Sequence, residues 1–133
     1  MSVIVTDKGF GQDDWTGDYA SLEDGGAAGI DLPSDTDPAA LAALPEGTEM
    51  VRIAFPSSAD GRGFTLARLL RLRGYRGRLR AQGHVIADQY AMARRCGFDE
   101  VEIDEALAER QPEDQWLFRA NWQAHDYQAR IRG

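Results

Sequence analysis

Apolar and polar residues follow two different rhythms through the middle of the chain. In three runs the apolar residues alternate with polar ones or fill the run, as is typical of β-strands, and in the two runs between them they recur at helical spacing. In chain order the five runs are Met50–Phe55, Phe64–Arg73, Gly77–Gln82, His84–Cys96 and Glu100–Asp104. The pattern therefore predicts strand, helix, strand, helix and strand.

The signals on either side of this block are weaker. Ser2–Thr6 and Ala27–Leu32 are β-rich runs and are predicted to be strands. Phe10–Gly26 is acidic and glycine-rich, so we interpret it as a loop with room for a second short strand. A short helix is expected over Pro38–Leu44, because an aspartate precedes the proline, and a C-terminal helix over Gln115–Ile131.

The predicted fold class is α/β, with a small open and mostly parallel sheet of three to five strands and helices packed on it. A β-α-β-α-β unit forms parallel strands through right-handed crossovers, and the chain is too short for a complete eight-stranded barrel. Either a doubly wound sheet or a fragment of a barrel satisfies the pattern. We expect one domain over residues 1–133, with an acidic region (1–49), the core (50–104) and the C-terminal helix (111–131).

Charge is distributed unevenly along the 133 residues. The net charge is −7, with 1 base and 11 acids in residues 1–50 (−10), 10 bases and 4 acids in 51–100 (+6), and 4 bases and 7 acids in 101–133 (−3). A basic block inside an acidic protein indicates a local anion site or internal ion pairs, and it disfavours broad nucleic-acid binding.

No run is long enough to span a membrane, and the N-terminus lacks the features of a signal peptide. The single cysteine cannot form an internal disulfide, so a cytoplasmic location is expected. Cys96 follows two arginines, which favour a reactive thiolate, but it also lies on the apolar stripe of a predicted helix, which favours a buried structural thiol. The two histidines, His84 and His125, lack metal-ligand spacing, and no metal site is predicted.

Parallel topology would bring the segments that follow the strands to one edge of the sheet, where ligands of open α/β sheets commonly bind. The segments are Asp60-Gly61-Arg62-Gly63, Gln82-Gly83-His84 and Asp104-Glu105. Glycine-rich turns and helix N-termini present free N–H groups to anions, and Arg62 would add a bidentate contact. The alternative is a tight turn in which Asp60 caps the helix and Arg62 pairs with a neighbouring acid. The turn matches neither a phosphate-binding Walker loop nor a dinucleotide fingerprint.

Two further charged positions bear on this site. Arg80 lies within a strand and must be paired if that face is covered. Asp88 either pairs with Arg80 or Arg62 and locks the site, or is a first-turn acid favoured by the helix dipole. The wider series from Arg68 to Arg80 is either a docking surface or a solvated face paired with the acidic N-terminal half.

Several short stretches together resemble a bacterial family, the domain of unknown function 934. The stretches are Phe55-Pro56, Asp60-Gly61-Arg62-Gly63, Ala67-Arg68-Leu69-Leu70-Arg71, Leu79-Arg80-Ala81, Gly83, Asp88-Gln89, Arg95-Cys96-Gly97-Phe98 and Tyr127-Gln128. Where the family tends to have aspartate or asparagine after the glycine, this chain has His84, which weakens or replaces the expected helix cap.

The resemblance implies a role in sulfur metabolism, because such proteins are often encoded beside sulfite reductase genes and some are labelled probable oxidoreductases. It supplies no catalytic residues, and the cofactor stays unknown. The first hypothesis is an accessory factor of assimilatory sulfate or sulfite reduction that binds a small anion or anionic cofactor at the carboxyl edge. The alternatives are an oxidoreductase that uses a nicotinamide or flavin, and a structural docking partner of a larger reductase. The expected partners are a small anion or nucleotide, a reductase component, or a second copy of the chain. Binding to nucleic acid or to a membrane is not expected.

Overall fold

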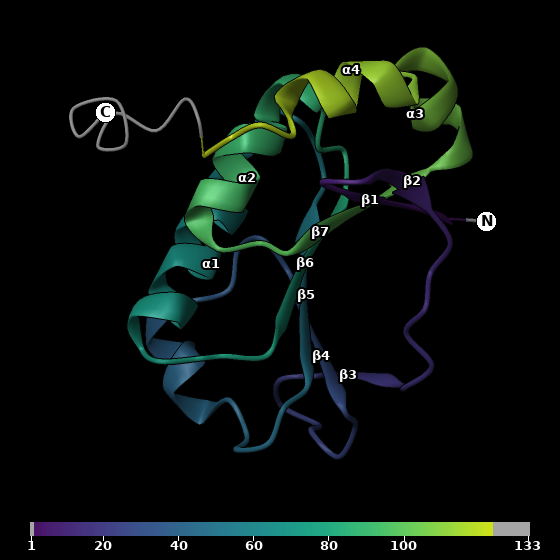
Figure 1. The fold of residues 1–133 in the computed structure, drawn as a ribbon. Coiled ribbons are helices and arrows are strands. Elements are labelled where there is room, and N and C mark those ends of the chain that lie inside the picture. Colours follow the sequence, from purple (N-terminus) through teal and green to yellow (C-terminus); the bar gives the residue numbers. More distant parts are fainter. Residues whose placement is uncertain (1, 124–133) are drawn as a thin grey trace.

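The computed structural model describes residues 2–123, and within them seven strands form one sheet (Figure 1). The strands are β1 (Ser2–Thr6), β2 (Gly9–Gly11), β3 (Tyr19–Ser21), β4 (Gly29–Leu32), β5 (Met50–Phe55), β6 (Arg78–Gly83) and β7 (Glu100–Asp104). Their order is β2-β1-β7-β6-β5-β4-β3, with β3 to β7 parallel and β1 and β2 antiparallel at one edge. The predicted α/β class with a mostly parallel open sheet is confirmed.

The strand number exceeds the predicted three to five. The additional strands β2 and β3 have three residues each and lie in or beside the glycine-rich segment that we interpreted mainly as loop. Runs this short carry no periodicity, so only pairing with β1 and β4 makes them strands.

The five parallel strands lie side by side in sequence order. Because each right-handed crossover then moves in the same direction across the sheet, every connecting helix must lie on the same face. Figure 1 shows α1 (Arg62–Leu72) and α2 (Tyr90–Cys96) together on one side of the sheet. The doubly wound alternative is therefore excluded, and the arrangement matches the other alternative, an open segment of barrel-like winding.

The remaining helices are short. They are η1 (Pro38–Ala43), η2 (Ala87–Gln89), α3 (Glu105–Arg110) and α4 (Glu113–Arg119). The chain stays extended at Ile86, so the helix predicted from His84 begins only at Ala87, while Gly97 ends it with the left-handed φ of 112°. The C-terminal helix ends earlier than predicted, because the chain turns after Arg119 and the Trp122 indole N–H reaches Asp7 at 3.2 Å. Positions 124–131 of that prediction lie outside the described residues.

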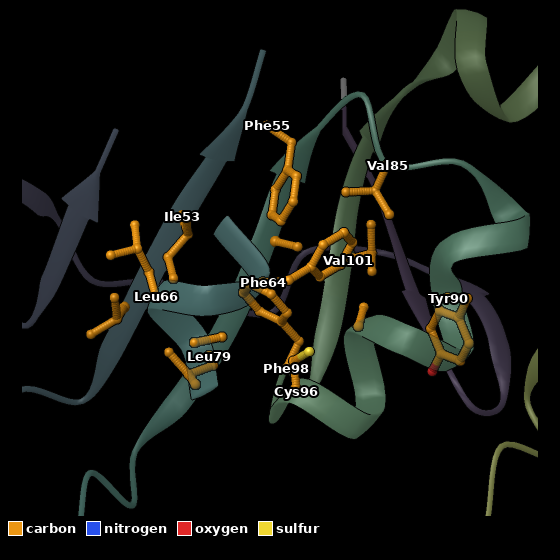
Figure 2. Packing of buried hydrophobic residues seen from close by; sticks show 14 of the residues in the cluster. Ile53, Phe55, Phe64, Leu66, Leu79, Val85, Tyr90, Cys96, Phe98 and Val101 are labelled. Carbon is orange, nitrogen blue, oxygen red and sulfur yellow. The ribbon is translucent and has the colours of Figure 1, made fainter. Parts of the chain in front are cut away.

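The main core lies between the sheet and its helices. Phe55, Phe64 and Phe98 pack with ring centroids 4.9–6.4 Å apart, and Figure 2 shows them among aliphatic side chains from both layers. Leu79 and Ala81 of β6 are fully buried on this side. Their neighbour Arg80 therefore projects from the opposite face, since side chains alternate along a strand.

Gly83 ends β6 in a conformation that other residues rarely adopt. Its φ is 122°, and a Cβ there would lie 2.5 Å from the Phe55 carbonyl oxygen, which also accepts a hydrogen bond from the His84 N–H at 2.9 Å. The glycine thus lets the chain turn closely over the end of β5 and sets the position of His84.

We expect Gly83→Ala to destabilise the protein more than Gly74→Ala. Gly74 has a φ of 96°, and a Cβ at this position would have no atom within 4 Å. Gly74→Ala should therefore lose only the free energy that a left-handed backbone costs a residue with a Cβ, about 1–2 kcal/mol. Gly83→Ala adds steric overlap and should lose about 2–4 kcal/mol in urea unfolding. Equal losses in the two variants would contradict the close approach at Gly83.

Candidate functional site

A hollow of about 380 Å³ lies at the carboxyl edge of the sheet, where the chain leaves β5 and β6 and passes beside α3. Its lining consists of Pro56, Ser57, Ser58, His84, Ile86, Leu107, Arg110 and Gln111. The position is the one expected from parallel topology, because the connections after β5 and β6 meet there. Of the predicted site residues, His84 lines this hollow and Gly83 immediately precedes it.

His84 is held by the loop that follows β5. Its Nδ1 lies 2.9 Å from the Pro56 carbonyl oxygen, so Nδ1 donates to that acceptor. The same loop is tied to the start of η2, because Gln89 donates from Nε2 to the Ser58 carbonyl at 2.7 Å and accepts at Oε1 from the Ile86 N–H at 3.1 Å. The imidazole is thus fixed through one nitrogen, and Nε2 has no partner within residues 2–123.

Arg110 supplies a positive charge to the lining of the same hollow. It lies in the last turn of α3, a helix capped by Asp104, whose side chain accepts from the Leu107 N–H at 2.8 Å. Gln111 accepts from the Ala87 N–H at 2.6 Å and so joins the end of α3 to η2. Arg110 forms no ion pair or hydrogen bond with any residue from 2 to 123, and no carboxylate lines the hollow.

Sequence reasoning missed Arg110, Ser57 and Ser58. A signal for Arg110 was present, because Asp104 followed by Glu105 and a run of good helix formers predicts a capped helix. Such a helix would have extended the carboxyl-edge segment by two turns and placed Arg110 beside the other connections.

The predicted Asp60-Gly61-Arg62-Gly63 turn lies at the same edge but is neutralised internally. Arg62 donates to Asp60 from Nε at 3.0 Å and from Nη2 at 2.8 Å, and its backbone N–H donates to the same carboxylate at 3.1 Å. These bonds hold the pKa of Asp60 well below its usual value. Gly63 packs against β5, since a Cβ there would lie 2.6 Å from the Phe55 ring. The geometry matches the interpretation of a tight turn with a local ion pair, and ligand binding by this turn stays a prediction.

Arg80 does not join the carboxyl-edge segments. Its side chain is fully buried on the face of the sheet opposite α1 and α2, which we call the helix-free face. There Nε donates to Glu100 at 2.6 Å, and Nη1 donates to Glu102 and Asp13 at 3.0 Å each. Burial alone would lower the pKa of Arg80, but Asp13 and Glu100 raise it above its ordinary value. The structure therefore separates Arg80 from the Asp60–Gly63 turn, with which we had grouped it.

Neighbouring charges extend this ion network across the helix-free face. Arg52 pairs with Asp31 at 2.7 Å, and Arg78 pairs with Glu100 at 2.7 Å and with Asp14 at 2.9 Å. Within the series from Arg68 to Arg80, two arginines pair with the acidic N-terminal half as that interpretation expected: Arg78 through Asp14 and Arg80 through Asp13.

The other predicted positions have separate surroundings. Asp88 pairs with Arg119 at 2.9 Å, so the suggested pairing with Arg80 or Arg62 does not form, and Asp88 is the first-turn acid of η2. Cys96 is buried, as the structural interpretation predicted. Arg71 donates to the backbone carbonyls of Gly97 and Gly77. His125 lies outside the described residues.

Removal of Arg80 should destabilise the fold strongly. Arg80→Ala leaves Glu100 and Glu102 buried without their shared partner, and we expect a loss of about 3–5 kcal/mol in urea unfolding. Arg68→Ala is the matched control, because Arg68 is exposed and has no partner within residues 2–123, and it should change stability by less than about 0.5 kcal/mol. A loss in Arg80→Ala no larger than in the control would show that the buried network does not hold the face together.

The Asp13 contact should make the protein acid-sensitive. Arg80 holds the pKa of Asp13 below its usual value, so the stability from this pair is present above about pH 4 and is lost as the pH falls through the folded-state pKa. We expect the difference in unfolding free energy between the wild type and Asp13→Asn to shrink as the pH falls from about 5 to about 2. Asp18→Asn, in the same exposed segment, serves as the control. A difference that stays constant with pH would rule out this linkage.

Comparisons with known proteins place the chain in a family. No curated protein and no solved structure matched the chain. Within residues 2–123, no group of three or more His, Cys, Asp and Glu side chains is arranged to hold a metal ion, and no helix there has the length and apolar character needed to cross a membrane. The model of one family matches residues 29–133, so the chain belongs to the family described as "Bacterial protein of unknown function (DUF934)".

Proposed function

We propose that this protein is a cytoplasmic accessory factor of assimilatory sulfate or sulfite reduction that binds a small oxyanion in the His84–Arg110 hollow. The observation that carries the proposal is the charge of Arg110, which has no counter-charge within residues 2–123 and lines the same hollow as His84, where no carboxylate is present in the lining. In a protein of net charge −7, a cationic recess with no carboxylate among its lining residues favours anions locally.

The lining provides the donors that such a ligand requires. Arg110 presents a planar fork suited to oxyanions, and Ser57 and Ser58 contribute hydroxyl groups from the loop after β5. Ile86 and Leu107 add apolar surface, which lowers the local dielectric and strengthens a charge-assisted contact. These residues bind and orient an anion, and none of them is assigned a catalytic step.

The Asp60–Gly63 turn and Arg80 are weaker candidates for this role. Arg62 and Arg80 already hold carboxylates at hydrogen-bond distance, so an incoming anion would have to displace Asp60 or Asp13. Arg110 has no such competitor within the described residues. The connection to sulfur assimilation rests on the family resemblance, and sulfate and sulfite belong to the oxyanions that an arginine fork binds.

Sulfate should stabilise the wild-type protein through this hollow. At a sulfate concentration about ten times the dissociation constant, the gain is about 1.4 kcal/mol, or roughly 3–6 °C in Tm for a domain of this size. Arg110→Ala should lose most of that gain, whereas Arg68→Ala and Arg62→Ala should retain it. The measurement is a thermal-shift panel of sulfate, sulfite, phosphate and nucleotides against chloride at matched ionic strength.

The comparison with Arg110→Ala is essential because sulfate also stabilises proteins by exclusion from their surface. That general effect is the same in all variants and cancels in the difference. A sulfate response equal in the wild type and Arg110→Ala would remove the proposed site. A response lost only in Arg62→Ala would instead place the anion at the Asp60–Gly63 turn.

A further inference from the structure

The fixed orientation of His84 has a consequence for the anion hollow. Nδ1 donates to the Pro56 carbonyl at 2.9 Å, which leaves Nε2 as the nitrogen that can exchange a proton with solvent or face a ligand. In the neutral ring, Nε2 is an acceptor and would repel an oxyanion. In the protonated ring, Nε2 becomes a donor and the whole ring becomes a cation.

The charges around His84 are few. Among the residues that line the hollow, Arg110 of α3 is the only other charged group, and the loop after β5 contributes Pro56, Ser57 and Ser58. The nearby elements do carry acids, but none lines the hollow: Asp88 of η2 pairs with Arg119, and Asp104 caps α3. Glu105 and Glu109 of α3 are exposed and also lie outside the lining.

The single permanent positive charge of Arg110 balances a monoanion, whereas a dianion requires a second positive charge to balance it. In the empty hollow, Arg110 is the permanent charge among the lining residues, and no carboxylate lines the hollow to offset it. A bound dianion would place an opposite charge close to the imidazole, and an opposite charge favours the protonated form of the ring. Binding of the anion and binding of the proton are then linked, and each strengthens the other by the same factor.

We propose that the hollow selects dianionic tetrahedral oxyanions and that His84 takes up one proton at Nε2 when such an anion binds. This inference rests on the proposed anion-binding function and adds the ligand class and its pH control. The proton comes from solvent, no covalent bond is made or broken, and the two charges of the anion are matched by Arg110 and the imidazolium. The Ser57 and Ser58 hydroxyls come from the loop after β5 and the arginine fork comes from α3, so the lining offers donors from two elements to the oxygens of one anion.

The test is isothermal titration of the full-length protein with sulfate from about pH 5.5 to about pH 8.5 at constant ionic strength. Sulfate stays a dianion throughout this range, so any change in affinity reports on the protein. On the alkaline side, the wild-type dissociation constant should rise by close to about tenfold per pH unit. Titrations in two phosphate-free buffers of different ionisation enthalpy should show that the protein takes up close to one proton for each sulfate bound. Nitrate, a monoanion, should bind at least about tenfold more weakly than sulfate at equal ionic strength.

His84→Gln keeps a hydrogen-bond donor but cannot titrate, so its affinity should be lower and nearly independent of pH. His125→Gln replaces the only other histidine and should keep the wild-type slope. Arg110→Lys keeps the charge but loses the fork, so it should bind more weakly with the slope retained. If His84→Gln fails to fold, proton NMR of the wild type follows the His84 ring instead, and its titration midpoint should move to higher pH in sulfate.

The outcomes separate the two proposals. Sulfate binding whose affinity does not change with pH, or a His84 midpoint that sulfate leaves unchanged, would overturn the proton linkage while the anion site stands. Nitrate binding as tight as sulfate binding would overturn the selectivity for dianions. No sulfate binding even at the acidic end of the range would overturn the proposed function itself.

Discussion

The order of the parallel strands is the constraint on which the rest of the structure depends. Strands β3 to β7 follow one another across the sheet in sequence order, so their right-handed connections lie on one face. That face has a conventional apolar core. The other face receives no connecting helix, and its strands must be covered in another way.

The protein covers the helix-free face with charge. Buried Arg80 is surrounded by Glu100, Glu102 and Asp13, and the last of these comes from the acidic segment between β2 and β3. Burying an arginine is costly unless its donors and its charge are matched, and here several carboxylates match them. The acidic character of the N-terminal region thus has a structural use, because the region supplies counter-charges to strands that carry arginine.

This use of charge also bears on function. Seven of the ten arginines of the basic block have partners within residues 2–123: acids pair with Arg52, Arg62, Arg78, Arg80 and Arg94, and carbonyl groups accept from Arg71 and Arg95. A count of arginines therefore says little about where an anion would bind. The informative cation is Arg110, which lies outside the basic block and lines the same hollow as His84 because α3 lies beside the connections that follow β5 and β6.

The alternation of apolar and polar residues by itself determined the β-α-β-α-β core, the parallel sheet, the ends of α1 and α2 at glycines, and the position of Gly83 and His84 at the carboxyl edge. Those features depend on local periodicity and on residues with special backbone freedom, which the sequence displays directly. Only the tertiary structure decided that Arg80 projects away from that edge, that Asp88 pairs with Arg119 and that Arg110 has no counter-charge among the described residues. Ion pairs join residues up to 87 positions apart, as Asp7 and Arg94 show, and no local pattern specifies which of many acids a given arginine will meet.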